Sequence, residues 1–150
     1  MLPVIISLLV LNTLAFLIPK RLSKIEMYST SLFALLWGHV VDMALDLKLT
    51  LYYYYKKGLQ WVDFMVPFLI YPSITILFLN FYPYNKANKS KIFYILGWSI
   101  FSITFEAIVD NTGFFTHVKW KLWHSAFIYP LLFIILLWHL KLIRKLIKNN

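Results

Sequence analysis

The sequence predicts an all-α fold, namely an integral membrane bundle of about five transmembrane helices joined by short loops. Of its 150 residues, 61% are hydrophobic and 14% are charged, whereas about 25% of the residues in soluble domains are charged. Continuous apolar stretches recur along the chain, each near the roughly 20 residues that cross a bilayer as a helix. A membrane β-barrel would instead alternate apolar and polar residues in segments of about ten. We therefore expect residues 1–150 to form a single multi-pass membrane domain in a lipid bilayer.

We expect the spans at about residues 2–19, 31–47, 61–83, 91–113 and 122–141. The first and third contain the uncharged windows Leu2–Pro19 and Phe64–Pro83, and nineteen uncharged residues separate Lys121 from Lys141. The second and fourth confine their polar residues to one face. The polar segments PKRLSKIEMYST, PYNKANKSK and KLIRKLIKNN connect or end the spans. Because the first span lacks a basic start and a small-residue cleavage site, we expect a retained helix rather than a secretory signal.

The basic residues indicate the orientation, because cytoplasmic loops carry an excess of Lys and Arg. Ten of the fifteen fall on one side of the predicted bundle: Lys20, Arg21, Lys24, Lys86, Lys89, Lys91, Lys141, Arg144, Lys145 and Lys148. The other five are Lys48, Lys56, Lys57, Lys119 and Lys121. We therefore expect the N-terminus outside and the C-terminus in the cytoplasm. Since the basic residues punctuate apolar segments and form no stripe, the net charge of +9 does not indicate a nucleic-acid partner.

The two outer connections, LKLTLYYYYKKGLQ and FFTHVKWKL, interleave aromatic or apolar residues with basic ones. This pattern suits short elements in the headgroup layer. It also suits an aromatic belt along a loop, which we favour because Tyr and Trp are common at any membrane interface.

Polar residues of the second and fourth spans form stripes. His39, Asp42 and Asp46 are spaced by three and four residues, and a rotation of about 100° per residue places them within about 60°. The fourth span repeats the pattern within about 80°. Its stripe consists of Ser99, Ser102, Glu106, Asp110 and Gly113. A mid-membrane aspartate costs about 2.5–3.5 kcal/mol, so both stripes should face the bundle interior or a wet cavity.

Both spans run outward in this topology, which brings four acids into the outer half of the bilayer. They cannot all ionise unpaired in low dielectric, because desolvation and like charge both disfavour the charged form. We predict a ligand or cation site made of His39, Asp42, Asp46, Glu106 and Asp110, with His117 and His124 as contributors from the outer face. We expect its ligand to be a cation or a proton, and the sequence does not indicate whether that cation is a metal ion. The chain has no cysteine, which excludes thiolate ligands, and we expect no cofactor.

A structural interpretation of these residues stays open. His39 would then be a hydrogen-bonded packing residue, and Asp46 and Asp110 would mark helix ends. Asp42 and Glu106 are the stronger functional candidates, since an acid within an apolar span usually has a functional reason.

The two outer hairpins resemble each other. DMALD precedes an aromatic, basic connection and then FLIYP, while EAIVD precedes a similar connection and then FIYP. The acidic pairs are 64 residues apart and the Tyr-Pro pairs 58. The sequence thus predicts a parallel repeat in which Pro72 and Pro130 interrupt equivalent spans, as in transporters with a site at the repeat interface. Chance similarity in so apolar a chain is the alternative.

Several segments resemble one family. DLKLTLYYYYKKG, PFLIYPSITILFLNFYP, YILGWS, the isolated Glu106 and VKWKLWHSAFIYP are similar to landmarks of an uncharacterised family of small multi-pass membrane proteins of bacilli and clostridia. The resemblance covers most of the chain beyond the first helix. It implies a bacterial cytoplasmic membrane and a Gram-positive source, and it assigns no catalytic residue.

Three functions fit these features. The first is a small transporter-like, channel-like or sensor protein, as a homo-oligomer or with a membrane partner, whose outward-facing acids bind a cation or proton. The second is a non-catalytic assembly or partner subunit held by its polar stripes, since interhelical hydrogen bonds contribute about 0.6–2 kcal/mol each. The third is an intramembrane enzyme acting on lipid or an isoprenoid through a metal, which no motif supports. We favour a non-enzymatic role.

Overall fold

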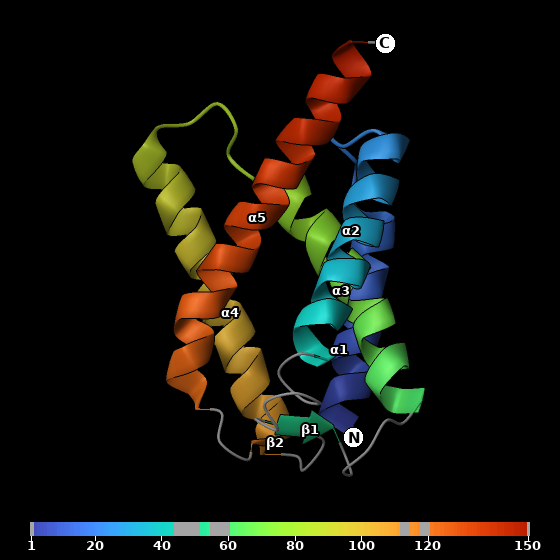
Figure 1. The fold of residues 1–150 in the computed structure, drawn as a ribbon, viewed down its shortest axis with the longest axis vertical. Helices are drawn as coiled ribbons and strands as arrows, with labels where there is room; N and C mark the ends of the chain where they lie inside the picture. Colours follow the sequence, from blue (N-terminus) through green and yellow to red (C-terminus); the bar gives the residue numbers. More distant parts are fainter. Residues whose placement is uncertain (1, 44–51, 55–60, 112–114, 118–120, 150) are drawn as a thin grey trace.

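The computed structural model describes the backbone of residues 2–43, 52–54, 61–111, 115–117 and 121–149, and the side chains of residues 4–41, 65–111 and 121–149. Its described helices are α1 (Leu2–Leu17), α2 (Lys24–Met43), α3 (Trp61–Phe81), α4 (Asn88–Asp110) and α5 (Leu122–Lys148). Successive helices alternate in direction, and the N- and C-termini lie at opposite ends of the bundle (Figure 1). The predicted all-α class is therefore confirmed.

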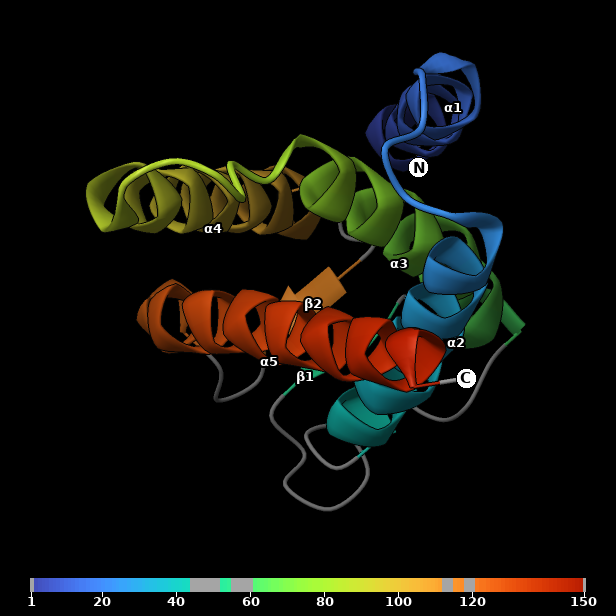
Figure 2. The ribbon, with the colours of Figure 1, turned by 90° about the horizontal axis from the view of Figure 1, so that it is seen from above.

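Helix α3 has α1 on one side and α2 on the other, as the view along the bundle shows (Figure 2). Helix α5 packs against both α4 and α2. Two helical hairpins, α2–α3 and α4–α5, thus face each other, and α1 is added to the outside of the first. This is the arrangement that the predicted repeat of two hairpins requires.

Helix α2 begins earlier than the predicted span at residues 31–47, because residues 23–26 form a capping box. The backbone N–H of Glu26 donates to Oγ of Ser23 at 3.2 Å, and the backbone N–H of Ser23 donates to Oε2 of Glu26 at 2.7 Å. This reciprocal pair satisfies two N–H groups that a helix start otherwise leaves without a partner. The expected connection PKRLSKIEMYST is therefore helical from Lys24 onward.

Helix α5 also exceeds its predicted span at residues 122–141, since it continues to Lys148. The segment LIRKLI keeps apolar residues at helical spacing, so one face can continue along the same stripe. The prediction that Pro72 and Pro130 interrupt their helices is wrong, because α3 and α5 each run through their prolines as single elements. Each proline still lacks the N–H that would bond the carbonyl four residues earlier.

The two outer connections each contain one three-residue strand, β1 (Tyr52–Tyr54) and β2 (Phe115–His117). The strands pair antiparallel, with Tyr52 opposite His117 and Tyr54 opposite Phe115. This small sheet lies at the end of the bundle opposite the C-terminus and joins the two hairpins (Figure 1). Each hairpin is therefore a helix, a strand and a helix in the same order.

In the described part of the chain, the largest cluster of buried hydrophobic residues lies toward the end that carries the C-terminus. Its buried members are Leu22, Phe78, Leu79, Phe133, Leu136 and Leu140. Asn80, which is 1% exposed, fixes the α1–α2 connection there, since its Nδ2 donates to the carbonyl of Pro19 and its Oδ1 accepts from the N–H of Arg21. The first three helices are thus tied at one end.

The outward faces of the helices are apolar, whereas several polar side chains are buried. Phe16, Phe93 and Phe127 are 83%, 72% and 73% exposed, while Thr30 and Ser99 are buried. Two helices, α4 and α5, are long and apolar enough to cross a membrane, which suggests association with one. In the described part of the chain, Val4–Leu17 and Met65–Phe81 form shorter apolar helices. Of the five expected spans, two are therefore helices with the length and apolar composition that crossing a membrane requires.

Candidate functional site

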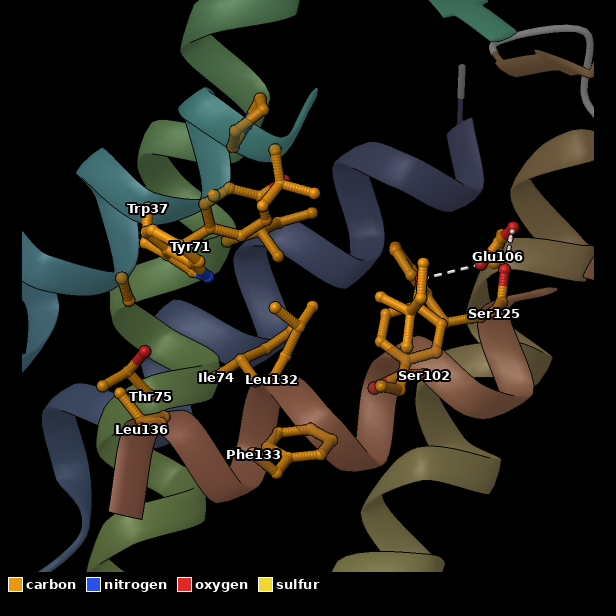
Figure 3. Close-up of a pocket in the computed structure, with 18 of the residues that line it drawn as sticks. Trp37, Tyr71, Ile74, Thr75, Ser102, Glu106, Ser125, Leu132, Phe133 and Leu136 are labelled. Carbon is orange, nitrogen blue, oxygen red and sulfur yellow. Dashed lines mark hydrogen bonds between the residues drawn. The ribbon is translucent and has the colours of Figure 1, made fainter. Parts of the chain in front are cut away.

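A cavity of about 270 Å³ lies between the two hairpins (Figure 3), lined mainly by α2, α3, α4 and α5 and also by Val4 of α1. Its lining is largely apolar, and its aromatic rings come from Phe33, Trp37, Tyr71, Phe101, Phe105, Tyr129 and Phe133. Trp37 and Tyr71 lie on one side of the cavity, whereas Glu106 and Ser125 lie on the other (Figure 3). Concave, mostly apolar spaces with a few placed polar groups are the usual form of small-ligand sites.

Glu106 is the one charged residue among the described residues that line this cavity. Both of its carboxylate oxygens accept hydrogen bonds from α5, since Oγ of Ser125 donates to Oε1 at 2.8 Å and the hydroxyl of Tyr129 donates to Oε2 at 2.7 Å. An ionised carboxylate only accepts hydrogen bonds, so two hydroxyl donors suit it. These contacts fix the carboxylate of Glu106 at the cavity wall.

The cavity lining follows the spacing of the sequence repeat. At the 64-residue offset of the acidic pairs, both members line the cavity for Trp37 and Phe101, Gly38 and Ser102, and Val41 and Phe105. At the 58-residue offset of the Tyr-Pro pairs, the same holds for Pro67 and Ser125, Ile70 and Ile128, Tyr71 and Tyr129, and Ile74 and Leu132. Equivalent positions of two similar hairpins thus surround one cavity, which supports the predicted repeat.

Of the predicted site residues in and after α2, the structure describes the side chain of one, His39. The Nδ1–H of His39 donates to the carbonyl of Leu35 at 2.8 Å, and its ring meets Tyr71 edge-on at 6.2 Å between centroids. His39 therefore packs behind a residue of the cavity wall. Asp42 lies in the last turn of α2, but its side chain is outside the described part, and Asp46 is outside the described residues altogether.

The remaining predicted residues lie near the end that carries the sheet. Asp110 is half-buried at the last position of α4. His124 caps α5, because its Nδ1 accepts the N–H of Lys121 at 3.0 Å. His117 belongs to β2, and its side chain is outside the described part. Across the described residues, no three His, Asp or Glu side chains are grouped as a metal site would require.

Sequence reasoning did not identify Ser125 and Tyr129 as partners of Glu106. The signal was present, since a hydroxyl at 125 and another at 129 are four residues apart and share a helix face. Tyr129 also belongs to the FIYP motif, as Tyr71 belongs to FLIYP. From these motifs the sequence predicted a role for the prolines and none for the tyrosines. The contact itself joins residues of two helices, and only their packing reveals it.

A second polar cluster lies at the other end of the bundle. Nε of Arg144 donates to Oε1 of Glu26 at 2.6 Å, and the guanidinium lies 4.6 Å from the ring centre of Tyr84. Burial alone would raise the pKa of Glu26, but the hydrogen bonds from Arg144 and Ser23 and the charge of Arg144 outweigh it and lower that pKa. Burial raises the pKa of the Tyr84 hydroxyl to about 12. Because this cluster ties α2 to α5, its role is structural.

Comparisons with known proteins return no relative. No protein-family model, curated protein or solved structure matches the chain. The function is therefore inferred from the cavity and the residues that line it.

Proposed function

We propose that the protein is a small transporter-like or sensor protein that binds a cation or proton at Glu106, in a cavity between two repeated hairpins. The observation that carries this proposal is the placement of one carboxylate, with hydroxyl donors on both oxygens, in a largely apolar lining whose other described residues are uncharged. Glu106 is half-buried at the wall of this cavity, and an acid within an apolar helix usually has a functional reason.

We also propose that all five helices cross a bacterial cytoplasmic membrane, with the N-terminus outside. The exposed apolar faces and the alternating helix directions support it, because the ten basic residues named above then share one end of the bundle. The chain has no cysteine, so single cysteines report the topology directly. A membrane-impermeant maleimide applied to intact cells should label Lys121→Cys and spare Asn85→Cys. The reverse labelling would contradict the orientation.

In the sequence repeat, Asp42 is the counterpart of Glu106. We propose it as the second acid of the site, with His39, Asp46 and Asp110 as the further predicted members. His117 and His124 remain proposed contributors from the outer face.

A second candidate function, a non-catalytic assembly or partner subunit, is favoured by the same contacts. The hydrogen bonds of Glu106 join α4 to α5, and interhelical bonds of this kind can hold a bundle without any ligand. The two functions differ in whether the charge of Glu106 is needed.

Glu106→Gln separates them, since Gln keeps an acceptor for a hydroxyl but carries no charge. The assay is a thermal-unfolding scan of the purified protein over pH and over cation concentration. We expect the wild type to respond to the cation, and Glu106→Gln to keep its abundance and lose that response. Glu26→Gln is the control for the cation scan, because it removes a buried acid that does not line the cavity and should keep the response to the cation. Its pH scan gives the part of the acid dependence that belongs to Glu26 itself, whose pKa is lowered. A wild type without a response to cations, and with a pH dependence that Glu106→Gln leaves unchanged, would favour the assembly role.

A further inference from the structure

One face of α5 is left largely uncovered by the described part of the chain. Its large side chains are 51–73% exposed and belong to Phe127, Leu131, Ile134 and Trp138. At about 100° per residue, these positions lie within about 60° of one another. The buried residues lie on the opposite side of the helix, where α5 packs against α2 and α4: Ser125, Phe133, Leu136 and Leu140. The uncovered face is therefore a continuous apolar stripe along the outside of the bundle.

The same face becomes basic beyond Trp138. Lys141, Lys145 and Lys148 are exposed, and they continue the stripe within an arc of about 60°. In the described part of the chain, none of these three lysines forms an ion pair. Residues 111–150 contain no Asp or Glu. The positive charges of this face are therefore available to a ligand.

Arg144 plays a different part, although it lies at the edge of the basic stripe. It is paired with Glu26 of α2, and its guanidinium lies over the ring of Tyr84. These contacts tie the end of α5 to the rest of the bundle. The lysines are thus presented on a helix whose position is already fixed, which reduces the entropy that binding would cost.

The two parts of the stripe match one leaflet of a bilayer in length. Phe127 and Trp138 are about 16 Å apart along the helix axis, and half of the hydrocarbon core is about 15 Å thick. Lys141 lies about 5 Å beyond Trp138, which is within the depth of the headgroup region. The last turns of α5 extend past the other helices at this end (Figure 1), and long lysine side chains can bend back toward that region.

We propose that this face binds an anionic phospholipid of the cytoplasmic leaflet. One acyl chain lies along Leu131 and Ile134, and the phosphate is held by Lys141 and Lys145. Basic clusters next to the cytoplasmic end of a membrane helix are typical of sites for anionic headgroups. A second copy of the chain does not suit this face, because it would bring the same cations to it. The inference rests on the proposed membrane placement and is independent of the ligand at Glu106.

Trp138 reports on this face directly, since it lies one turn before Lys141. The full chain is reconstituted in vesicles of phosphatidylcholine and phosphatidylglycerol, with bromine atoms on the acyl chains of one lipid at a time. Bromine quenches the fluorescence of a tryptophan that it contacts, and the difference between the wild type and Trp138→Phe isolates the signal of Trp138. At equal mole fraction, we expect the phosphatidylglycerol to quench Trp138 more strongly than the phosphatidylcholine.

Two double variants and a matched control locate the headgroup. Lys141→Gln with Lys145→Gln should lower the preference for phosphatidylglycerol, by up to about fivefold for each lysine. Lys141→Arg with Lys145→Arg keeps both charges and should keep the preference. Lys89→Gln with Lys91→Gln removes the same charge from the same end of the bundle, but at the start of α4, which lies away from the end of α5 (Figures 1 and 2). This control should leave the quenching of Trp138 unchanged.

Three outcomes would overturn the inference, and they separate it from the membrane placement. Equal quenching by the two lipids would reject an anionic lipid and leave an acidic protein segment as the partner of the lysines. Equal effects of the Gln variants on α5 and on α4 would show a response to the overall charge and no site on this face. Absence of quenching of Trp138 by either lipid would reject the membrane placement of this face as well.

Discussion

Gly38 lies where α2 meets the ring of Tyr71 at the cavity wall, and its replacement by Ala tests that contact. A Cβ at this position would lie 2.3 Å from Cε2 and 2.7 Å from Cδ2 of Tyr71, whereas ordinary contact begins at 3.4 Å. The ring must therefore move by about 1 Å. Gly97 in α4 is the matched control, because a Cβ there meets nothing within 4 Å.

The magnitude follows from comparing the two variants. Ala is favoured over Gly inside a helix by up to about 1 kcal/mol, and this gain is common to both positions. Overpacking of a close contact costs about 1–3 kcal/mol, and it applies at Gly38. We therefore expect Gly97→Ala to be neutral or stabilising, and Gly38→Ala to be less stable than Gly97→Ala by about 1–3 kcal/mol.

The assay is equilibrium unfolding in mixed detergent micelles, with the helical circular dichroism as readout. Gly38→Ala combined with Tyr71→Leu should recover stability, since the obstructing ring is gone. If the two Ala variants were equally stable, the close contact between Gly38 and Tyr71 would be refuted.

Two further predictions concern the end of the bundle that carries the C-terminus. Arg144→Gln leaves the buried carboxylate of Glu26 without its cation. Because the Arg144 side chain is 37% exposed, we expect the free energy of unfolding to fall by about 1–3 kcal/mol, a value between those for exposed and buried ion pairs. Since the pKa of Glu26 is lowered from 4.5, its contribution to stability is present above that pH and is lost as the pH falls below it. Unfolding scans at decreasing pH should show this loss in the wild type and less of it in Arg144→Gln; equal acid profiles would contradict the pairing. Asn80→Leu removes the buried amide that holds Pro19 and Arg21. Thermal unfolding should then show a loss of stability of about 1–3 kcal/mol for each backbone group left without a partner. An unchanged unfolding midpoint would show that water replaces the amide.

The helices themselves could be predicted from the sequence because their signals are local. Apolar windows and a 3.6-residue period depend on neighbouring residues only, and they placed all five helices. The capping box at Ser23 and Glu26 is also local and would have placed the start of α2, but the polar composition around it indicated a connection. The two strands, Tyr52–Tyr54 and Phe115–His117, lie in connections that interleave aromatic and basic residues. Such a composition is as typical of an aromatic belt at a membrane interface as of a short strand, so it did not identify the strands.

The sequence by itself determined that Glu106 belongs to a polar stripe turned away from the apolar face of its helix, and that the two hairpins share a spacing. The tertiary structure alone decided that Ser125 and Tyr129 bond to this carboxylate, that equivalent positions of both hairpins enclose one cavity, and that Glu26 pairs with Arg144. The physical reason is that a helix period fixes which side chains share a face, whereas the partner of that face depends on how helices distant in the chain pack together.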